Sequence, residues 1–226
     1  SIQYLITLQH KTCLMEKNPL LQFSNIPITT DILYGCFNRL SSPDDKILAL
    51  EKSGELIRLR RGLYVVNQEL SGKPYAKGLY ANHIYGPSYV SLQWATHWYG
   101  LIPEMVTMVT SVTTQRSRHY DSPLGRYAYY HMQEGYYNIG IRMVKDEKNG
   151  VTMLMATPEK ALCDTIMHDR YIPGQSVKAL WQYLEEDIRF DTDALRDFDI
   201  NIIEQCAQYQ RKTNILQNLI KIIKKL

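Results

Sequence analysis

The spacing of apolar residues near the start of the chain predicts three helices. The first covers residues 2–18 and places its apolar side chains near one face. The second lies within residues 26–40, where one of two adjacent threonines is expected to cap it. The third begins after Ser42, with a proline in its first turn, and ends at Gly54. A trio of helices is therefore expected in this part of the chain.

A short hairpin is predicted directly after the third helix, in the sequence GELIRLRRGLYVV at residues 54–66. Side chains alternate across a strand, so Ile57 and Leu59 are expected to point inward while Arg58 and Arg60 point outward. Three helices followed by a two-stranded ribbon is the element order of a winged helix-turn-helix. The first 66 residues are therefore assigned to such a domain.

Beyond the hairpin, the pattern changes to strands and helices separated by turns. Glycine, proline and serine in residues 67–75 indicate a linker. A helix is expected over residues 88–100, with Ser88 as its cap. β-Branched and aromatic residues predict strands in three later regions, at residues 104–113, 126–132 and 139–156.

The last of these regions predicts a hairpin, because Asn149-Gly150 suits a two-residue turn. Thr157 then caps a helix, and helical spacing extends into the terminal sequence KIIKKL. That end is expected to be a docked amphipathic helix, with a membrane, nucleic acid or a second subunit as alternative contacts. The predicted fold class is α+β, with a winged helix-turn-helix over residues 1–66 and a mixed α+β domain with a C-terminal helical region over residues 76–226.

Composition adds an expected location to this picture. With 226 residues, 45% of them apolar and 22% charged, the chain has the balance of a globular protein of one or two domains. No apolar run approaches the roughly 20 residues of a membrane span, and no basic and apolar leader opens the sequence. The four cysteines are scattered, which is typical of free thiols in a reducing compartment. A cytoplasmic protein without membrane contact is expected.

Charge is distributed unevenly along the chain. Residues 1–66 carry 8 Lys/Arg against 6 Asp/Glu, residues 67–208 carry 13 against 17, and residues 209–226 carry 5 against none. Two basic ends around an acidic middle favour a polyanionic partner, and the element order of a winged helix-turn-helix favours DNA as that partner. The side chains expected to contact DNA are Arg39, Lys46, Lys52, Arg58, Arg60 and Arg61.

The three arginines of the hairpin are expected to lie on the wing, where they neutralise DNA phosphates. Such contacts provide affinity and register but little information about the bases. Asp44 and Asp45 oppose binding, since they place two carboxylates at the start of the helix expected to read the major groove. A helical trio with a hairpin also serves as a protein-docking module, and a basic hairpin can simply be solvated.

Four segments of the chain occur in the order found in one protein family. They are GELIRLRRGLYVV, PSYVSLQWATHWYGLIPE, TSVTTQRSRHYDSPLGRYAYYHM and ATPEKALCDTI. Together they cover about residues 20–170 and resemble the AbiEi family of bacterial antitoxins, which are also transcriptional regulators. The residues that match the family's wing and reading helix are Lys46, Gly54, Arg58, Arg60, Arg61 and Gly62. Asp44 and Asp45 depart from the family pattern.

The resemblance implies one component of a type IV toxin–antitoxin system, which acts in abortive infection as a phage defence. The component is encoded beside a nucleotidyltransferase-like toxin called AbiEii. An N-terminal winged helix that represses its own operon is implied, together with a C-terminal domain needed for antitoxicity. Direct contact with the toxin is not implied, because antitoxins of this type are expected to counter the toxin's effect. Two operator half-sites would be bound by a dimer or by two monomers.

The chain carries no motif with catalytic, nucleotide-binding or metal-binding spacing. Its six histidines are widely spaced, and it has no glycine motif that cradles phosphate. A nuclease site of two carboxylates and a lysine would have to use Asp121, Glu134 and Lys145, whose spacing is not diagnostic. No enzyme activity, cofactor or metal is therefore expected. Cys163 and Asp164 are expected in the core.

The sequence TTQRSRHY is the best functional candidate in the second domain. Its cationic and aromatic side chains, which can hold phosphates or stack on bases, are Arg116, Arg118, His119 and Tyr120. The competing interpretation is a strand end whose arginines pair with the acidic run at residues 185–199. Two other hypotheses stay open: a nucleic-acid-processing enzyme or RNA-binding factor that uses this segment, and a non-catalytic module whose exposed tyrosines contact a protein.

Overall fold

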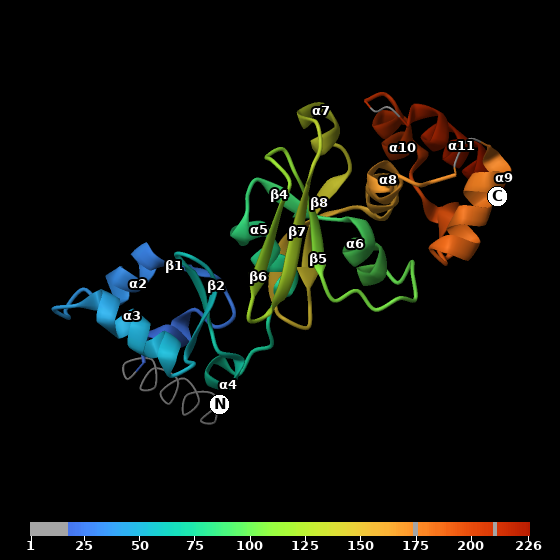
Figure 1. Ribbon diagram of the computed structural model, residues 1–226. Coiled ribbons are helices and arrows are strands. Elements are labelled where there is room, and N and C mark those ends of the chain that lie inside the picture. The colour runs from blue at the N-terminus through green and yellow to red at the C-terminus, as the bar shows by residue number, and fades with distance from the viewer. Residues whose placement is uncertain (1–17, 174–175, 210–211) are drawn as a thin grey trace, which may run out of the picture. The chain divides into compact units, whose positions relative to one another are not determined.

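The computed structural model describes residues 18–173, 176–209 and 212–226, so the helix predicted for residues 2–18 lies outside the described residues apart from Asn18. Contacts within the chain divide it into two compact units. The first runs to Ile84 and includes residues 122–124 and 146–151, and the second contains the remaining residues. Helices and sheets occur together, which confirms the α+β fold class (Figure 1).

The first unit contains a small sheet and several short helices. Its elements are η1 (Pro19–Gln22), β1 (Ile28–Thr29), α2 (Thr30–Cys36), α3 (Pro43–Lys52), β2 (Leu56–Arg60), β3 (Leu63–Val66), α4 (Gln68–Ser71) and α5 (Lys77–Ile84). The strand order is β1–β3–β2, and both pairings are antiparallel. The second and third predicted helices and the predicted hairpin are thus confirmed, and residues 67–75 fall within this unit.

A single apolar core joins α2 and α3 to the small sheet. Its buried members are Leu20, Ile28, Leu33, Phe37, Ile47, Leu50, Leu56, Tyr64 and Val66. Local sequence sets both ends of α3, which has Pro43 in its first turn and Gly54, with a φ of +79°, after its end. The threonine predicted to cap α2, Thr29, stands at the N-cap position but makes no side-chain cap hydrogen bond. The core therefore fixes the two helices against the strands.

The predicted alternation along β2 is wrong at one position. Leu59 is buried while Arg58 and Arg60 are exposed, as expected. Ile57, however, is partly exposed, and Leu56 is buried in its place. The pairing register with β3 shifts between Arg58 and Arg60, so a bulge adds a residue to β2 and breaks the period of two.

The second unit is built on a six-stranded mixed sheet. Its strands are β4 (Ser88–Val90), β5 (Val109–Thr113), β6 (Arg118–Ser122), β7 (Gly125–His131), β8 (Ile141–Asp146) and β9 (Val151–Ala156). They lie in the order β6–β7–β5–β4–β9–β8. β4 is antiparallel to β5 and parallel to β9, and β5 is parallel to β7. The sheet therefore ends in β6 at one edge and in β8 at the other.

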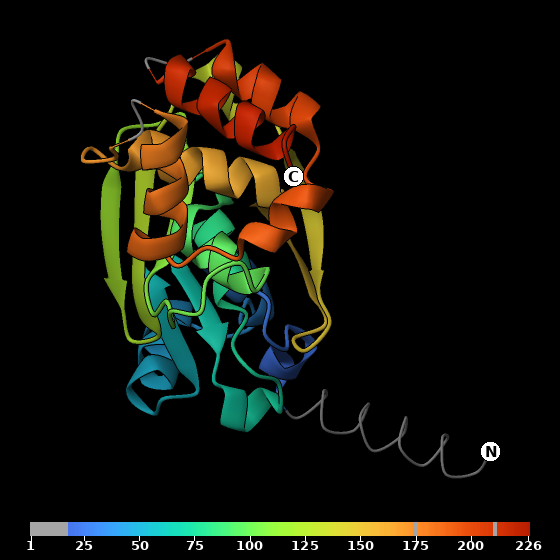
Figure 2. The ribbon, with the colours of Figure 1, turned by 90° about the vertical axis from the view of Figure 1, so that its right-hand side faces the viewer.

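Helices of the second unit pack in layers on this sheet and on each other. They are α6 (Leu92–Trp98), α7 (Glu134–Tyr137), α8 (Pro158–His168), α9 (Val177–Gln182), η2 (Tyr183–Asp187), η3 (Thr192–Asp197), α10 (Ile200–Ala207) and α11 (Thr213–Ile223). α8 contacts α6, α10 and α11, and Figure 2 shows the last two, in red, stacked over α8. Most of α8 is buried between these neighbours.

The C-terminal helix α11 is docked, as its amphipathic sequence predicts. Its buried side includes Leu219, Ile222 and Ile223, which face the helices beside it. On its exposed side, Lys224 Nζ lies 3.3 Å from Glu204 Oε1 of α10. Among the helices of the described residues, none has the length and apolar content to span a bilayer.

The helix predicted over residues 88–100 is wrong in its first part. Ser88, Tyr89 and Val90 form β4, and α6 begins only at Leu92, with Ser91 at the N-cap position. Tyr89 and Val90 are completely buried, and β4 pairs on both sides. Pairing in the centre of a sheet overrides a helical pattern that a single sequence window suggests.

The hairpin predicted at residues 139–156 is confirmed, but its two-residue turn is wrong. β8 ends at Asp146 and β9 begins at Val151, so the connection has four residues. The Asp146 carboxylate accepts hydrogen bonds from the backbone and side-chain N–H groups of Asn149, and Gly150 has a φ of +68°. This local bonding by Asp146 favours the longer turn.

Replacing Thr157 tests the predicted cap of α8. The Thr157 hydroxyl accepts a hydrogen bond from Lys160 N at 3.3 Å, so a Thr157→Ala variant is expected to lose about 1 kcal/mol of unfolding free energy in urea denaturation. Gln133, at the N-cap of α7, makes no such side-chain bond, and Gln133→Ala is the control. Equal losses in the two variants would show that the Thr157 cap contributes nothing.

Candidate nucleic-acid interface

The tip of the β2–β3 hairpin presents two adjacent arginines to solvent. Arg60 and Arg61 are both exposed, and neither forms an ion pair with a carboxylate of the described residues. Among the described residues, the only hydrogen bond of either side chain runs from Arg60 Nη1 to the carbonyl oxygen of Arg61, at 3.4 Å. Within the described part of the chain, both charges are free to meet an anion.

The hairpin tip is held against the start of α2. The backbone N–H of Thr30 donates to the carbonyl oxygen of Gly62 at 3.2 Å. Gly62 has a φ of +77°, a conformation that side chains with a Cβ rarely adopt, so glycine is required in this turn. The bond fixes where the tip arginines lie relative to the helices. A hairpin that contacts the sugar–phosphate backbone of DNA would need such a fixed position.

The third arginine of the hairpin is partly neutralised. Arg58 Nη2 lies 2.5 Å from Glu51 Oε2 of α3, and the two side chains are 45% and 26% exposed. The hydrogen bond to Glu51 raises the pKa of the Arg58 guanidinium above its usual value. Arg58 therefore has less free charge to offer a phosphate than the two arginines at the tip.

The remaining predicted contacts lie on or near α3. Lys46 and Lys52 are exposed on this helix, and Arg39 is exposed in the turn before it. Asp44 and Asp45 are exposed in the first turn of α3. The exposed side of α3 therefore carries both signs of charge, and the conflict expected from the sequence is present.

Asp44 is engaged by the neighbouring helix. Tyr34 of α2 donates its phenolic hydrogen to Asp44 Oδ1 at 2.6 Å, and this bond raises the pKa of Tyr34. The bond ties the start of α3 to α2 and occupies one lone pair of the carboxylate. It does not remove the negative charge, so a phosphate near this end of α3 would be repelled.

The four residues predicted as a second-domain patch do not form one cluster. Arg116 lies in the segment before β6. Alternation along β6 places Arg118 and Tyr120 on one face of the strand and His119 on the other. Arg118 and Tyr120 share a face with Tyr85, whose ring centroid is 5.7 Å from Arg118 Cζ. His119 packs on the other face.

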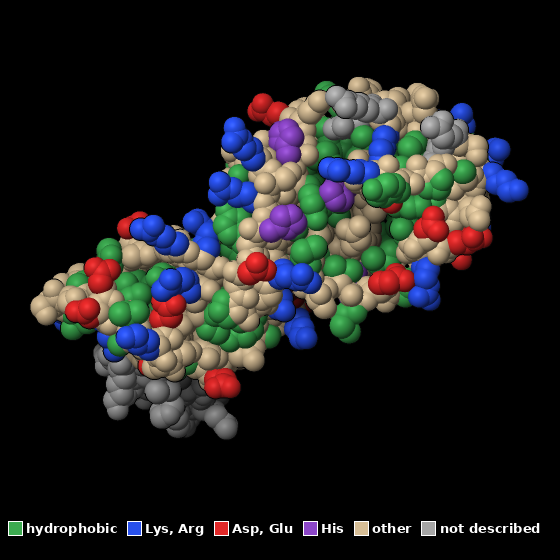
Figure 3. Space-filling model, viewed as in Figure 1, with side chains coloured by type: hydrophobic (Ala, Val, Ile, Leu, Met, Phe, Trp, Pro, Cys, Tyr) green, Lys and Arg blue, Asp and Glu red, His purple; other side chains and the backbone are tan. Residues whose placement is uncertain are grey.

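The alternative prediction, in which the arginines of this segment pair with the acidic run at residues 185–199, is not seen among the described residues either. No ion pair of the described residues joins Arg116 or Arg118 to a carboxylate in residues 185–199. Arg118 instead bonds to Tyr120, which raises the pKa of its guanidinium. These arginines are exposed, and Figure 3 shows blue Lys and Arg side chains with purple His side chains gathered over the β6–β7 end of the sheet.

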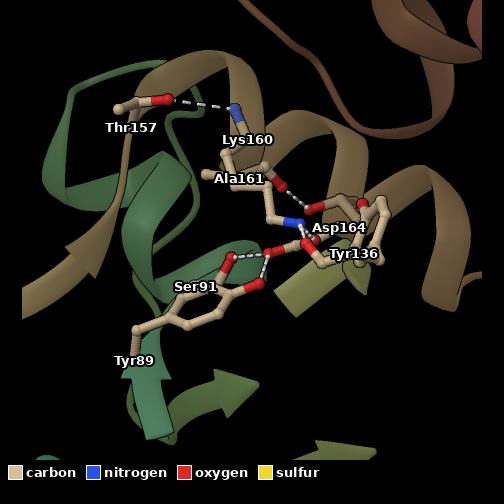
Figure 4. Close-up of polar contacts among 8 residues, drawn as sticks. Tyr89, Ser91, Tyr136, Thr157, Lys160, Ala161 and Asp164 are labelled. Atoms are coloured by element: carbon tan, nitrogen blue, oxygen red, sulfur yellow. Dashed lines mark hydrogen bonds and ion pairs between the residues drawn. The ribbon is translucent and has the colours of Figure 1, made fainter. Parts of the chain in front are cut away.

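A buried polar cluster lies at the centre of the second unit (Figure 4). Lys160 and Asp164, one turn apart on α8, are both completely buried, with Nζ 3.2 Å from Oδ1. Lys160 Nζ donates to the carbonyl oxygen of Tyr136 at 2.9 Å and lies 3.1 Å from the centre of that ring. Asp164 Oδ1 accepts no hydrogen bond from the described residues, so its contact with Lys160 is mainly ionic.

The other carboxylate oxygen of Asp164 holds β4 to α8. Ser91 Oγ donates to Asp164 Oδ2 at 2.6 Å, and the Tyr89 hydroxyl donates to the same atom at 3.0 Å. Burial, together with the Asp164 charge, raises the pKa of Tyr89 well above its usual value. Because Tyr89, Lys160 and Asp164 are sealed from solvent, the cluster acts by joining strand and helix rather than by touching a ligand.

The sequence prediction correctly placed Cys163 and Asp164 in the core but missed the cluster that Asp164 forms with Lys160. Cys163 is buried in the core as expected, and a hydrogen bond shared with Cys206, together with burial, raises the pKa of the Cys163 thiol. The signal in the sequence was a lysine and an aspartate four residues apart on the predicted helix, Lys160 and Asp164, a spacing that places both on one side of it.

The described residues hold no arrangement suited to a metal. No group of three or more His, Cys, Asp or Glu side chains among them is placed to bind an ion. Asp121 lies on β6 and Lys145 on β8, which are opposite edges of the sheet, so the three residues of the nuclease alternative do not converge.

Neither a scan against protein-family models nor a search of curated proteins found a match to this chain.

Proposed function

We propose that the chain is a DNA-binding transcriptional autoregulator and antitoxin of the AbiEi type, acting against a nucleotidyltransferase-like toxin of a type IV toxin–antitoxin operon. The observation that carries the proposal is the pair of exposed arginines at the hairpin tip, Arg60 and Arg61, which have no ion pair among the described residues. The four family-like sequence segments support the antitoxin assignment.

In this proposal the first unit is a winged helix whose β2–β3 hairpin is the wing. Arg60 and Arg61 lie along the sugar–phosphate backbone, and releasing counterions from the DNA drives their binding. Lys46 and Lys52 of α3, with Arg39 before it, supply the remaining positive charge. The Thr30–Gly62 bond keeps the tip at a fixed position beside α2, so the phosphate contacts set the register on the duplex.

Charge removal at the tip tests the DNA-binding part of the proposal. Log K falls with log salt with a slope of about −0.9 for each neutralised phosphate. An Arg60→Gln/Arg61→Gln variant is therefore expected to make this negative slope less steep by about 2. Its affinity should fall equally for all DNA sequences, because phosphate contacts carry no base information. The measurement is a gel-shift titration of the operon's own promoter DNA at several salt concentrations.

The matched control removes the same charge from the second unit. An Arg189→Gln/Arg196→Gln variant loses two exposed arginines that pair with Glu104 and Asp193, and its slope is expected to stay unchanged. An unaltered slope in the tip variant, or the same decrease in both variants, would contradict DNA binding by the hairpin.

The antitoxin part of the proposal is tested separately in cells that express the toxin. The Arg60→Gln/Arg61→Gln protein is expected to protect as well as the unaltered protein when both are expressed from a foreign promoter, because the resemblance assigns antitoxicity to the C-terminal domain. A nucleotidyltransferase gene next to this one is also expected. Absence of protection by the unaltered protein against that neighbour would refute the antitoxin assignment.

A further inference from the structure

A solvent-exposed cleft lies in the second unit beside the β6–β7 end of the sheet. Its volume is about 430 Å³, within the range of small-molecule sites, and it is formed by α6, the segment before β5, β7 and the end of α8. The lining side chains that matter here are Gln93, Met105, Met108, Arg126, Tyr130 and His168. None of the described residues that line it is acidic.

The charge of the cleft is positive in an acidic part of the chain. Arg126 is exposed and forms no ion pair with the described carboxylates. The β6–β7 segment, residues 114–131, has three arginines against one aspartate, whereas residues 67–208 as a whole carry an excess of acids. An arginine with its guanidinium free in a shallow cleft is suited to a phosphate or carboxylate, which it can bind with two parallel hydrogen bonds.

One wall of the cleft consists of packed rings. The Tyr130 and His168 ring centroids are 3.9 Å apart at 40°, and His119 meets Tyr130 edge-on at 6.0 Å. Burial lowers the pKa of His168, so its ring is neutral near pH 7 and offers one hydrogen-bond donor and one acceptor. Such a wall provides a flat, polar-edged surface of the kind on which a nucleobase stacks.

The remaining lining is apolar and adaptable. Met105 is 84% exposed, and Met108 lies on the same segment before β5. Thioether side chains are flexible and polarisable, and they make favourable contacts with aromatic rings. Gln93 of α6 adds an exposed amide, with both a donor and an acceptor for the edge of a planar ligand.

We propose that this cleft binds a nucleotide. Arg126 holds the phosphate, and the base lies between the Tyr130–His168 wall and the methionine segment. A free nucleotide and the terminal nucleotide of a single strand share this chemistry, and the experiment distinguishes them. The inference stands independently of DNA binding, since it uses no residue of the β2–β3 hairpin.

Calorimetric titration of the full-length protein tests the site with defined probes. The four nucleoside monophosphates, the corresponding nucleosides, ribose 5-phosphate and a short single-stranded RNA are each titrated. At least one monophosphate or the RNA is expected to bind more tightly than its nucleoside and than ribose 5-phosphate. Arg126→Gln is expected to weaken that binding by about tenfold to a hundredfold, since it removes a charge-assisted bond. Arg126 is exposed, so this variant should fold.

A second variant and a control locate the ligand. Tyr130→Leu is expected to weaken nucleotide binding by about tenfold and to leave ribose 5-phosphate unaffected, because it removes only the stacking surface. Arg196→Gln removes the same charge from an exposed position on η3 and should bind as the unaltered protein does.

The outcomes separate the two ligand sources and the null result. Tighter binding of the RNA than of every monophosphate assigns the cleft to a strand end, and the reverse order assigns it to a free nucleotide. No binding by any probe, equal binding of ribose 5-phosphate and the monophosphates, or unchanged binding by Arg126→Gln would each overturn the proposal. An Arg60→Gln/Arg61→Gln protein that loses DNA but binds the nucleotide normally would show that the two sites are independent.

Discussion

An Asp164→Ala variant is expected to lose about 3–5 kcal/mol of unfolding free energy, because it leaves Lys160 charged and uncompensated in the core. Both side chains are completely buried, and Nζ of Lys160 lies 3.2 Å from the carboxylate. The same substitution removes the acceptor that Ser91 and Tyr89 share. Since α8 is connected to β4 through these bonds, the loss should affect the cooperative unfolding of the whole second unit.

Urea denaturation followed by circular dichroism measures this effect, and a double variant isolates its cause. Lys160→Met/Asp164→Asn leaves no buried charge and keeps an amide oxygen for Ser91 and Tyr89. It is therefore expected to be more stable than Asp164→Ala and than Lys160→Met alone, which gives a favourable coupling between the two sites. Purely additive losses would mean that the ion pair contributes only packing.

Local sequence was sufficient to predict the elements whose ends are set by their own residues. Pro43 with two acidic neighbours marks the start of α3, and Thr157 with Pro158 marks the start of α8. The β2–β3 hairpin followed from its alternation and Gly62. In each case a side chain or a backbone preference acts within a few residues, so no knowledge of the rest of the chain is needed.

Features that depend on tertiary contacts were not predictable in the same way. Tyr89 and Val90 form a strand only because β5 and β9 flank them, and the bulge in β2 arises from its pairing with β3. Lys160 is satisfied by a carbonyl 24 residues away, at Tyr136, which no spacing rule anticipates.

The candidate sites likewise combine features that local sequence predicts with features that depend on tertiary contacts. The exposure of Arg60 could be predicted from strand alternation, whereas the neutralisation of Arg58 by Glu51 required the packing of α3 on β2. His119 and Arg118 were grouped because they are adjacent in sequence, and the β6 strand separates them. Arg126 and His168 line one cleft although they are 42 positions apart in the sequence, so they could be grouped only in three dimensions.

A Gly140→Ala variant is expected to lose roughly 2–5 kcal/mol, because a side chain at this position meets both conformational strain and a tightly packed helix. Gly140 has a φ of +59°, and an added Cβ would lie 2.9 Å from Lys160 Cβ and 2.9 Å from Ile202 Cγ2. The Gly140 carbonyl also accepts a hydrogen bond from the Thr157 backbone N–H at 2.8 Å. Relieving these contacts would require Lys160 in the first turn of α8 or Ile202 of α10 to move.

Gly100→Ala separates the two causes of that loss. Gly100 belongs to the same unit and has a φ of +72°, but an added Cβ there meets no atom of the described residues within 4 Å. Its substitution should therefore cost only the conformational term, about 1–2 kcal/mol. The difference between the two variants in urea denaturation measures how closely the backbone at Gly140 approaches α8 and α10. Equal losses would mean that Lys160 and Ile202 move aside freely, and the buried Lys160–Asp164 pair would then be held less rigidly than its contacts indicate.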